Sequence, residues 1–193
     1  LTVTGGTGGA SYTNGTQVAI SADAPAPGKA FSQWIGDTQY VNNVTYTSAL
    51  VTMSTNAVSL TATYVDVLYT LTVTGGSNSG PYTNGTQVAI SANAPATGKV
   101  FYRWTGDTQY VNNVTYTNAL VTMSTNNVSL TATYVDVYYA LTINSGSGDG
   151  SYTNGRQVAI SADTPAGTVF YQWIGDTQYV DNVSSASATV TSR

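Results

Sequence analysis

The sequence contains three tandem copies of one unit, and this repetition restricts the possible folds more than any other feature. Each copy opens on an LTV or LTI run, continues through YTNG and QVAI, and later carries one tryptophan. The first two copies align without a gap, and the third lacks one residue near Gly167. Repeats of this kind are separate structural units arranged along the chain. We therefore expect three tandem modules, with the bounds 1–70, 71–140 and 141–193.

Each copy carries signals for short β-strands separated by turns, and no pattern typical of a helix. Apolar and polar residues alternate along Val58–Tyr64, which is the pattern of a half-buried strand. Asn14 and Gly15 tolerate the positive φ that a tight hairpin turn requires. The proline-containing stretch Ala22–Lys29 is typical of a loop. These features predict an all-β fold with about five strands in each module.

The junction between the first two copies, Val65–Thr70, contains no glycine, proline or serine. Flexible linkers are rich in glycine and serine, so we expect an extended and fairly stiff connection. The modules should then lie along a rod, and each complete module should bury its own core. The predicted core residues of the first module are Val18, Ile20, Phe31, Trp34 and Leu60.

The third copy is shorter than the other two, because it ends at Arg193, just after the stretch equivalent to Val121. It has no counterpart of Met123–Tyr134, which includes the alternating run Val128–Tyr134. We therefore expect the third module to lack its last strand and to leave an unpaired sheet edge. Two outcomes are open: a poorly ordered third module, or a gap filled by a strand from a neighbouring copy of the chain.

The composition excludes several classes of partner. Charged residues make up 7% of the chain, against about 25% in an ordinary soluble protein. The net charge is −4, so no basic surface is available to attract nucleic acid or anionic lipid. No apolar run approaches the length of about 20 residues that a membrane-spanning helix needs. We expect neither nucleic-acid binding nor membrane insertion.

The acidic residues are all aspartates at repeated positions, and their pattern argues against catalysis. Asp23 of the first copy is Asn93 in the second and Asp163 in the third. Asparagine cannot act as a proton donor or base, whereas aspartate and asparagine both serve well in turns. The chain contains no histidine and no cysteine to form a nucleophile–base pair. We therefore expect no enzymatic activity, no catalytic residue and no bound cofactor.

The combined pattern LTVTGG, YTNGTQVAI, GK-x-F-x-x-W-x-G-D and VSLTATY resembles the divergent InlB B-type repeats of large bacterial surface and secreted proteins. Its most specific part is W-x-G-D, found at Trp34–Asp37, Trp104–Asp107 and Trp173–Asp176. The resemblance covers all three copies except the missing end of the third. It implies small β-grasp-like modules, sometimes with a short helix or helical turn, that act as stalks, spacers or adhesive segments outside the cell.

Trp34, Trp104 and Trp173 are equivalent residues, and each follows a phenylalanine by three positions. A small module needs a large apolar side chain to close its core, so a structural core role is the first interpretation. The alternative is an exposed aromatic surface that stacks on a sugar ring.

Asp37, Asp107 and Asp176 end the W-x-G-D elements, immediately after a glycine. A turn role is the simplest interpretation for an aspartate in this position. Calcium binding is the alternative, although the chain has no dense Asp-x-Asp-x-Asp loop of the kind that supplies six to eight oxygen ligands.

Two functions follow from this sequence. The first is a structural segment, namely a stalk, a spacer or a subunit of an extracellular polymer, in a bacterial surface or secreted protein. Its partners would be neighbouring repeats or other copies of the chain, including partners held by strand complementation. The second is an adhesive module for glycans or host surfaces, in which repetition supplies avidity. Burial of the three tryptophans would favour the first.

Overall fold

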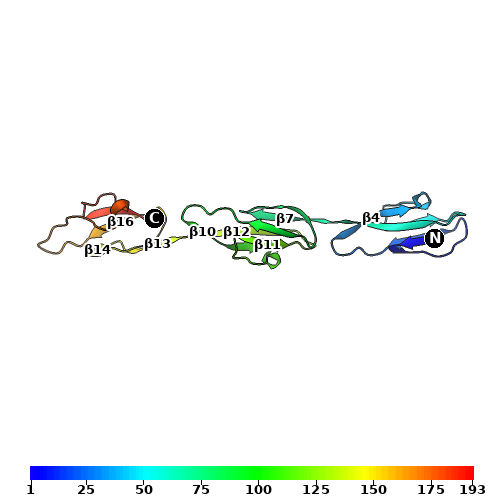
Figure 1. The fold of residues 1–193 in the computed structure, drawn as a ribbon, viewed down its shortest axis with the longest axis horizontal. Helices are drawn as coiled ribbons and strands as arrows, with labels where there is room; N and C mark the ends of the chain where they lie inside the picture. The colour runs from blue at the N-terminus through cyan, green and yellow to red at the C-terminus, as the bar shows by residue number, and fades with distance from the viewer.

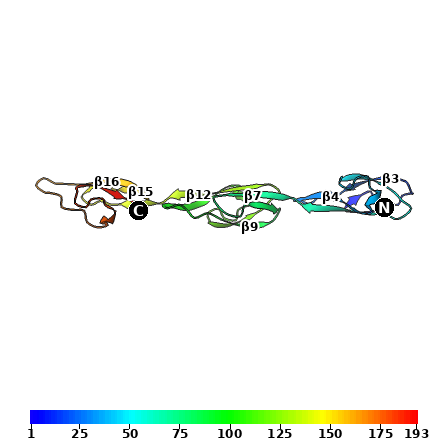
Figure 2. The same ribbon diagram turned by 90° about the horizontal axis from the view of Figure 1, so that it is seen from above.

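A computed structural model describes all residues, 1–193. The chain forms three small β modules in a line, as Figures 1 and 2 show, and this confirms the predicted all-β fold and tandem arrangement. The strands of the first module are β1 (Thr2–Thr4), β2 (Gly6–Thr7), β3 (Gln17–Ala22), β4 (Lys29–Gly36), β5 (Ser48–Thr52) and β6 (Ser59–Asp66). The second has β7 (Leu68–Thr74), β8 (Gly80–Thr83), β9 (Gln87–Ser91), β10 (Lys99–Gly106), β11 (Asn118–Thr122) and β12 (Val128–Asp136). The third has β13 (Tyr138–Leu141), β14 (Gly146–Ser147), β15 (Gly150–Thr153), β16 (Gln157–Ala162) and β17 (Ser187–Thr191).

Two layers of strands make up a complete module. In the second module the larger sheet has the order β10-β12-β7-β8, and the smaller sheet pairs β9 with β11. The last strand, β12, runs parallel to β7 and antiparallel to β10, so it lies inside the sheet. In the first module β6 likewise lies between β1 and β4, but both sheets have three strands, because β2 joins β3 and β5 and no strand corresponds to β8.

Alternation along the strands explains why each sheet buries one face. Val128, Leu130 and Ala132 of β12 point into the core and are at most 7% exposed, while the residues between them face solvent. The apolar core is separate in each module, because no buried cluster contains residues of two modules. Of the predicted core residues, Val18, Ile20, Trp34 and Leu60 are buried, whereas Phe31 is half-buried against that core.

The structure adds elements that the residues did not predict. Complete modules have six strands, because the short strand β2 and the hairpin strand β8 join those expected. A single 3-10 turn follows each W-x-G-D element, and these turns are the only helical elements. They are η1 (Thr38–Tyr40), η2 (Thr108–Tyr110) and η3 (Thr177–Tyr179).

The predicted consequence of the missing last strand was wrong in one respect. We expected one unpaired edge, but the missing strand would lie inside the larger sheet, so its loss divides that sheet. In the third module β13 pairs only with β15, and residues 168–175 form no strand. Its core has three buried residues, against eleven in the second module, which shows how much apolar burial depends on this strand.

Candidate functional site

The W-x-G-D element begins with a tryptophan that closes the core. Trp34 and Trp104 are each 1% exposed. The indole Nε1 of Trp104 donates to the carbonyl oxygen of Tyr116 at 2.9 Å, and Trp34 makes the same bond to Tyr46 at 3.0 Å. A buried indole with a satisfied N–H presents no face to a ligand. In the two complete modules, therefore, these tryptophans cannot serve as stacking surfaces for sugars.

The glycine of the element makes space for the last strand. Gly106 has a φ of +102°, and a Cβ at this position would lie 2.3 Å from the carbonyl oxygen of Ser129. Gly36 has a φ of +109° and the same distance to Ser59. Only glycine combines this φ with so close an approach of the neighbouring backbone.

The aspartate of the element binds the start of the last strand at two points. The backbone N–H of Asp37 donates to the carbonyl oxygen of Ser59 at 3.0 Å, and its Oδ2 accepts from the N–H of Ser59 at 2.8 Å. Asp107 makes the same pair of bonds with Ser129, at 2.9 Å and 2.8 Å. The structure brings no group of three or more acidic side chains together around these residues or elsewhere.

In the third module the same element has the same backbone conformation but no strand to hold. Asp176 has φ −76° and ψ 58°, against −77° and 56° for Asp107, and Gly175 has a φ of +103°. A Cβ on Gly175 would meet nothing within 4 Å. Trp173 keeps its Nε1 bond, to the carbonyl oxygen of Ser185 at 2.9 Å, but is only half-buried. Trp173 is thus less enclosed than its predicted core role required, because the last strand does not cover it.

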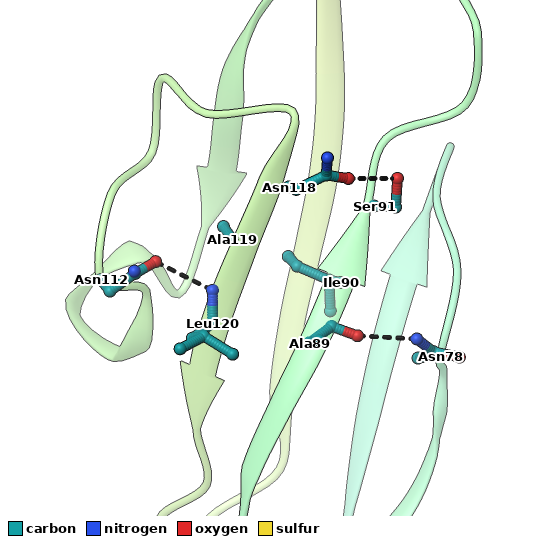
Figure 3. A pocket seen from close by; sticks show the side chains of 8 residues that line it. All are labelled: Asn78, Ala89, Ile90, Ser91, Asn112, Asn118, Ala119 and Leu120. Carbon is teal, nitrogen blue, oxygen red and sulfur yellow. Dashed lines mark hydrogen bonds between the residues drawn. The ribbon is translucent and has the colours of Figure 1, made fainter.

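An open groove recurs at the same place in each module, over the paired strands β3 and β5, β9 and β11, or β16 and β17. Figure 3 shows the groove of the second module. Its volume is about 420 Å³ in the second module. Eight residues line it there: Asn78, Ala89, Ile90, Ser91, Asn112, Asn118, Ala119 and Leu120. Hydrogen bonds already engage its polar side chains, with Asn118 accepting from Ser91 at 2.7 Å and Asn78 donating to the carbonyl of Ala89 at 2.7 Å. The groove therefore contains neither a charged group nor an aromatic surface in this module.

Asn112 has a structural role in this groove that the sequence analysis missed. Its backbone N–H donates to the carbonyl of Leu120 at 2.9 Å, and its Oδ1 accepts from the N–H of Leu120 at 2.8 Å. These bonds cover the outer edge of β11. Asp181 does the same for Thr189 in the third module, at 3.0 Å and 2.7 Å. The sequence contained a signal for this role, namely the exchange of Asn112 for Asp181 between copies. Both side chains have the Oδ1 atom that accepts the hydrogen bond.

A second hollow lies on the other side of the 3-10 turn, beside Tyr110. Side-chain hydrogen bonding, chiefly with Ser124 and then with Gln109, lowers the pKa of Tyr110 from its usual value.

Comparison with known proteins identifies the repeat. The sequence profile of the divergent InlB B-repeat domain matches residues 1–68, 69–137 and 139–193, which confirms the predicted resemblance. No curated protein matches the chain. The chain also has no helix of the length and apolarity needed to cross a bilayer.

Proposed function

We propose that this chain, which belongs to the divergent InlB B-repeat domain family, is a stiff structural spacer in a bacterial cell-surface or secreted protein. The family is typical of bacterial surface proteins, which supports an extracellular location. In this proposal the chain is not an enzyme and needs no cofactor. The geometry of the two junctions between modules carries the proposal.

Each junction is one residue long. Strand β6 ends at Asp66 and β7 begins at Leu68, so only Val67 lies between them. Three residues of the predicted junction, Leu68–Thr70, pair with β8 and belong to the second module. The second junction is equivalent, with Val137 between β12 and β13. A single extended residue between two paired strands has little freedom to bend.

A backbone hydrogen bond holds the junction residue against the preceding module. The backbone N–H of Val67 donates to the carbonyl oxygen of Gly28 at 2.8 Å, and Val137 makes the same bond to Gly98 at 2.8 Å. Close to the first of these bonds, Lys29 forms an ion pair with Asp66 at 2.7 Å. Such an exposed pair contributes at most about 1 kcal/mol, so the backbone bond is the more important restraint.

The turns of neighbouring modules also touch each other. A Cβ on Gly28 would lie 2.6 Å from the Cβ of Asn84 in the next module, and Gly98 has the same relation to Asn154. The contact thus repeats at both junctions. Identical junctions produce identical steps between modules. The three modules lie in a line in Figure 2.

Adhesion is a second candidate, and one observation supports it. Tyr46 and Tyr116 are equivalent residues and are 60% and 59% exposed. Exposed tyrosines at one place on successive modules could contact a glycan or a host protein surface, and repetition would add avidity. The third module has Ser185 at this position, which weakens the adhesive interpretation for the whole array.

Spin labels attached through Thr55→Cys and Thr125→Cys test the spacer proposal. Both positions are exposed and equivalent, and the chain has no other cysteine. We expect one narrow distribution of distances between the labels, because the junction is held at both sides. Insertion of Gly-Gly-Ser after Val67 should broaden it. A distribution that is equally broad without the insertion would show that the modules move independently and would reject the spacer.

Gly28→Ala tests the contact between the turns more finely. The added methyl would collide with Asn84, so we expect the distance distribution to shift or broaden. Gly15→Ala is the matched control, because Gly15 lies in the same module and has a similar φ, +81° against +80°, and nothing lies within 4 Å of its Cβ position. Equal effects of the two substitutions would mean that the contact does not orient the modules.

A further inference from the structure

We propose that the second module binds a carboxylated sugar, of the kind found in acidic polysaccharides, through Tyr102 and Arg103 of β10. Strand β10 is an edge strand of the larger sheet, so a long polymer can approach it from the side. The two residues line neither the groove over β9 and β11 nor the hollow beside Tyr110. The proposal does not depend on the spacer role, and it gives the adhesive candidate a specific site and ligand class.

A β-bulge turns two consecutive side chains of β10 toward solvent. The pairing of β10 with β12 shifts register between Phe101 and Arg103, so Tyr102 has no partner residue on β12. Bulges re-aim side chains in this way and are frequent next to functional sites. Tyr102 is 52% exposed and Arg103 is also exposed, whereas the flanking Phe101 and Trp104 pack in the core. The bulge therefore presents an aromatic ring and a cation side by side.

Hydrogen bonds on both sides hold the backbone of the bulge. The hydroxyl of Thr133 on β12 donates to the carbonyl oxygen of Arg103 at 2.6 Å. On the other side of β10, the backbone N–H of Trp104 donates to the carbonyl oxygen of Val114 at 2.8 Å. The backbone that carries the two exposed side chains is thus fixed before a ligand arrives, which lowers the cost of ordering on binding.

Arg103 has no carboxylate partner within the chain. The two ion pairs of the chain both use lysines. The guanidinium carbon of Arg103 instead lies 5.2 Å from the centre of the Tyr102 ring, over its face. A guanidinium in this position keeps N–H groups free along its edge, and their planar arrangement matches a carboxylate in a bidentate manner.

A carboxylated sugar matches both groups of the site. Its carboxylate binds the guanidinium, and the apolar C–H face of its ring packs on exposed tyrosine. Tyr116 adds a second aromatic side chain near β10, because its carbonyl oxygen accepts from the indole of Trp104 and its side chain is 59% exposed. An acidic peptide needs only the guanidinium, so the combination of cation and tyrosines favours the sugar.

Only the second module combines these residues. The first module has Ser32 and Gln33 at the bulge, and the third has Tyr171 and Gln172 at the equivalent positions. The first module forms the same bulge, with a register shift between Phe31 and Gln33, so the fold requires neither tyrosine nor arginine there. The charge also favours the second module, because its two basic residues balance its two aspartates. Each of the other modules has two more aspartates than basic residues and repels an acidic ligand more strongly.

Titration of the full chain with oligogalacturonate, followed by NMR signals of the backbone amides, tests the proposal. We expect saturable shifts at residues 101–105 and none at the equivalent residues 31–35, with weaker binding as salt is added, because the guanidinium is exposed. The methyl ester of the same oligosaccharide keeps the sugar rings without the charge and should bind about fivefold more weakly. A peptide of aspartates with equal charge lacks the rings and should also bind more weakly. Equal binding of the ester or of the peptide would contradict the proposal.

Exchange of residues between modules provides matched variants that the repeat already tolerates. Tyr102→Ser with Arg103→Gln gives the second module the residues of the first, and we expect it to lose the shifts while keeping its melting temperature. Ser32→Tyr with Gln33→Arg is the reverse exchange and should create a second site at 31–35, where Tyr46 is already present. The proposal is wrong if either exchange leaves oligogalacturonate binding unchanged. The distances between spin labels at positions 55 and 125 do not involve these side chains, so that result would leave the spacer proposal intact.

Discussion

Asp107 and Ser129 are joined by two hydrogen bonds, one from each backbone N–H, at 2.9 Å and 2.8 Å. They lie 22 residues apart in the sequence and connect the end of β10 to the start of β12. Asp37 and Ser59 make the same connection in the first module. The aspartate of the W-x-G-D element therefore positions the last strand of its own module.

Asp107→Ala should destabilise the second module by about 1.5–3 kcal/mol, because it removes a hydrogen bond to a charged group. Asp107→Asn keeps an oxygen acceptor and should cost less. Residue-resolved hydrogen exchange of β12 in the full chain measures the effect. The control is Asp23→Asn, which copies the residue of the second module. Unchanged exchange at Ser129 in the alanine variant would refute this role.

Trp104→Ala should cost about 3–5 kcal/mol, the usual range for removing a large buried aromatic side chain. Trp173→Ala should cost clearly less, because Trp173 is only half-buried. Denaturant unfolding followed by NMR signals from each module separates the two effects in the full chain. If Trp104→Ala lowered the free energy of unfolding no more than Trp173→Ala, burial of Trp104 by β12 could not be the reason that its side chain stabilises the module.

Gly106→Ala and Gly175→Ala form a second pair. Both alanines would adopt a positive φ, +102° and +103°, which costs about 1–3 kcal/mol at each site. Only at Gly106 would the new Cβ meet the carbonyl oxygen of Ser129, 2.3 Å away. We therefore expect Gly106→Ala to lower the melting temperature of its module further, as measured by calorimetry. Equal losses of melting temperature in the two variants would show that the positive φ alone explains why glycine is required at Gly106.

Asn112→Ala should expose the edge of β11, because the N–H of Leu120 loses its acceptor. The expected loss is about 1 kcal/mol, with faster exchange confined to the amide of Leu120 and its neighbours. Asn112→Asp should be tolerated, since Asp181 fills this place in the third module. A large loss with Asp would mean that the amide nitrogen, and not the shared oxygen, is needed.

Three properties follow from the sequence alone: the three tandem modules, their all-β character and the burial of residues such as Val18 and Ile20. These depend on local patterns, since alternation along a strand and Asn-Gly turns act over a few residues. Repetition then showed that Asp23 and Asn93 are interchangeable, which identifies a structural position without any coordinates.

Other properties were decided only by the tertiary structure. Local sequence patterns do not predict that β12 lies between β10 and β7. Nor do they predict that Asp107 binds Ser129 or that Gly28 contacts Asn84. Each of these relations joins residues far apart in the sequence, and they exist only once strands have paired and modules have met. Strand pairing is chosen by which apolar faces can be buried together, a property of the assembled module. For the same reason the tryptophan strand forms in the two complete modules and not in the third, although all three carry its sequence.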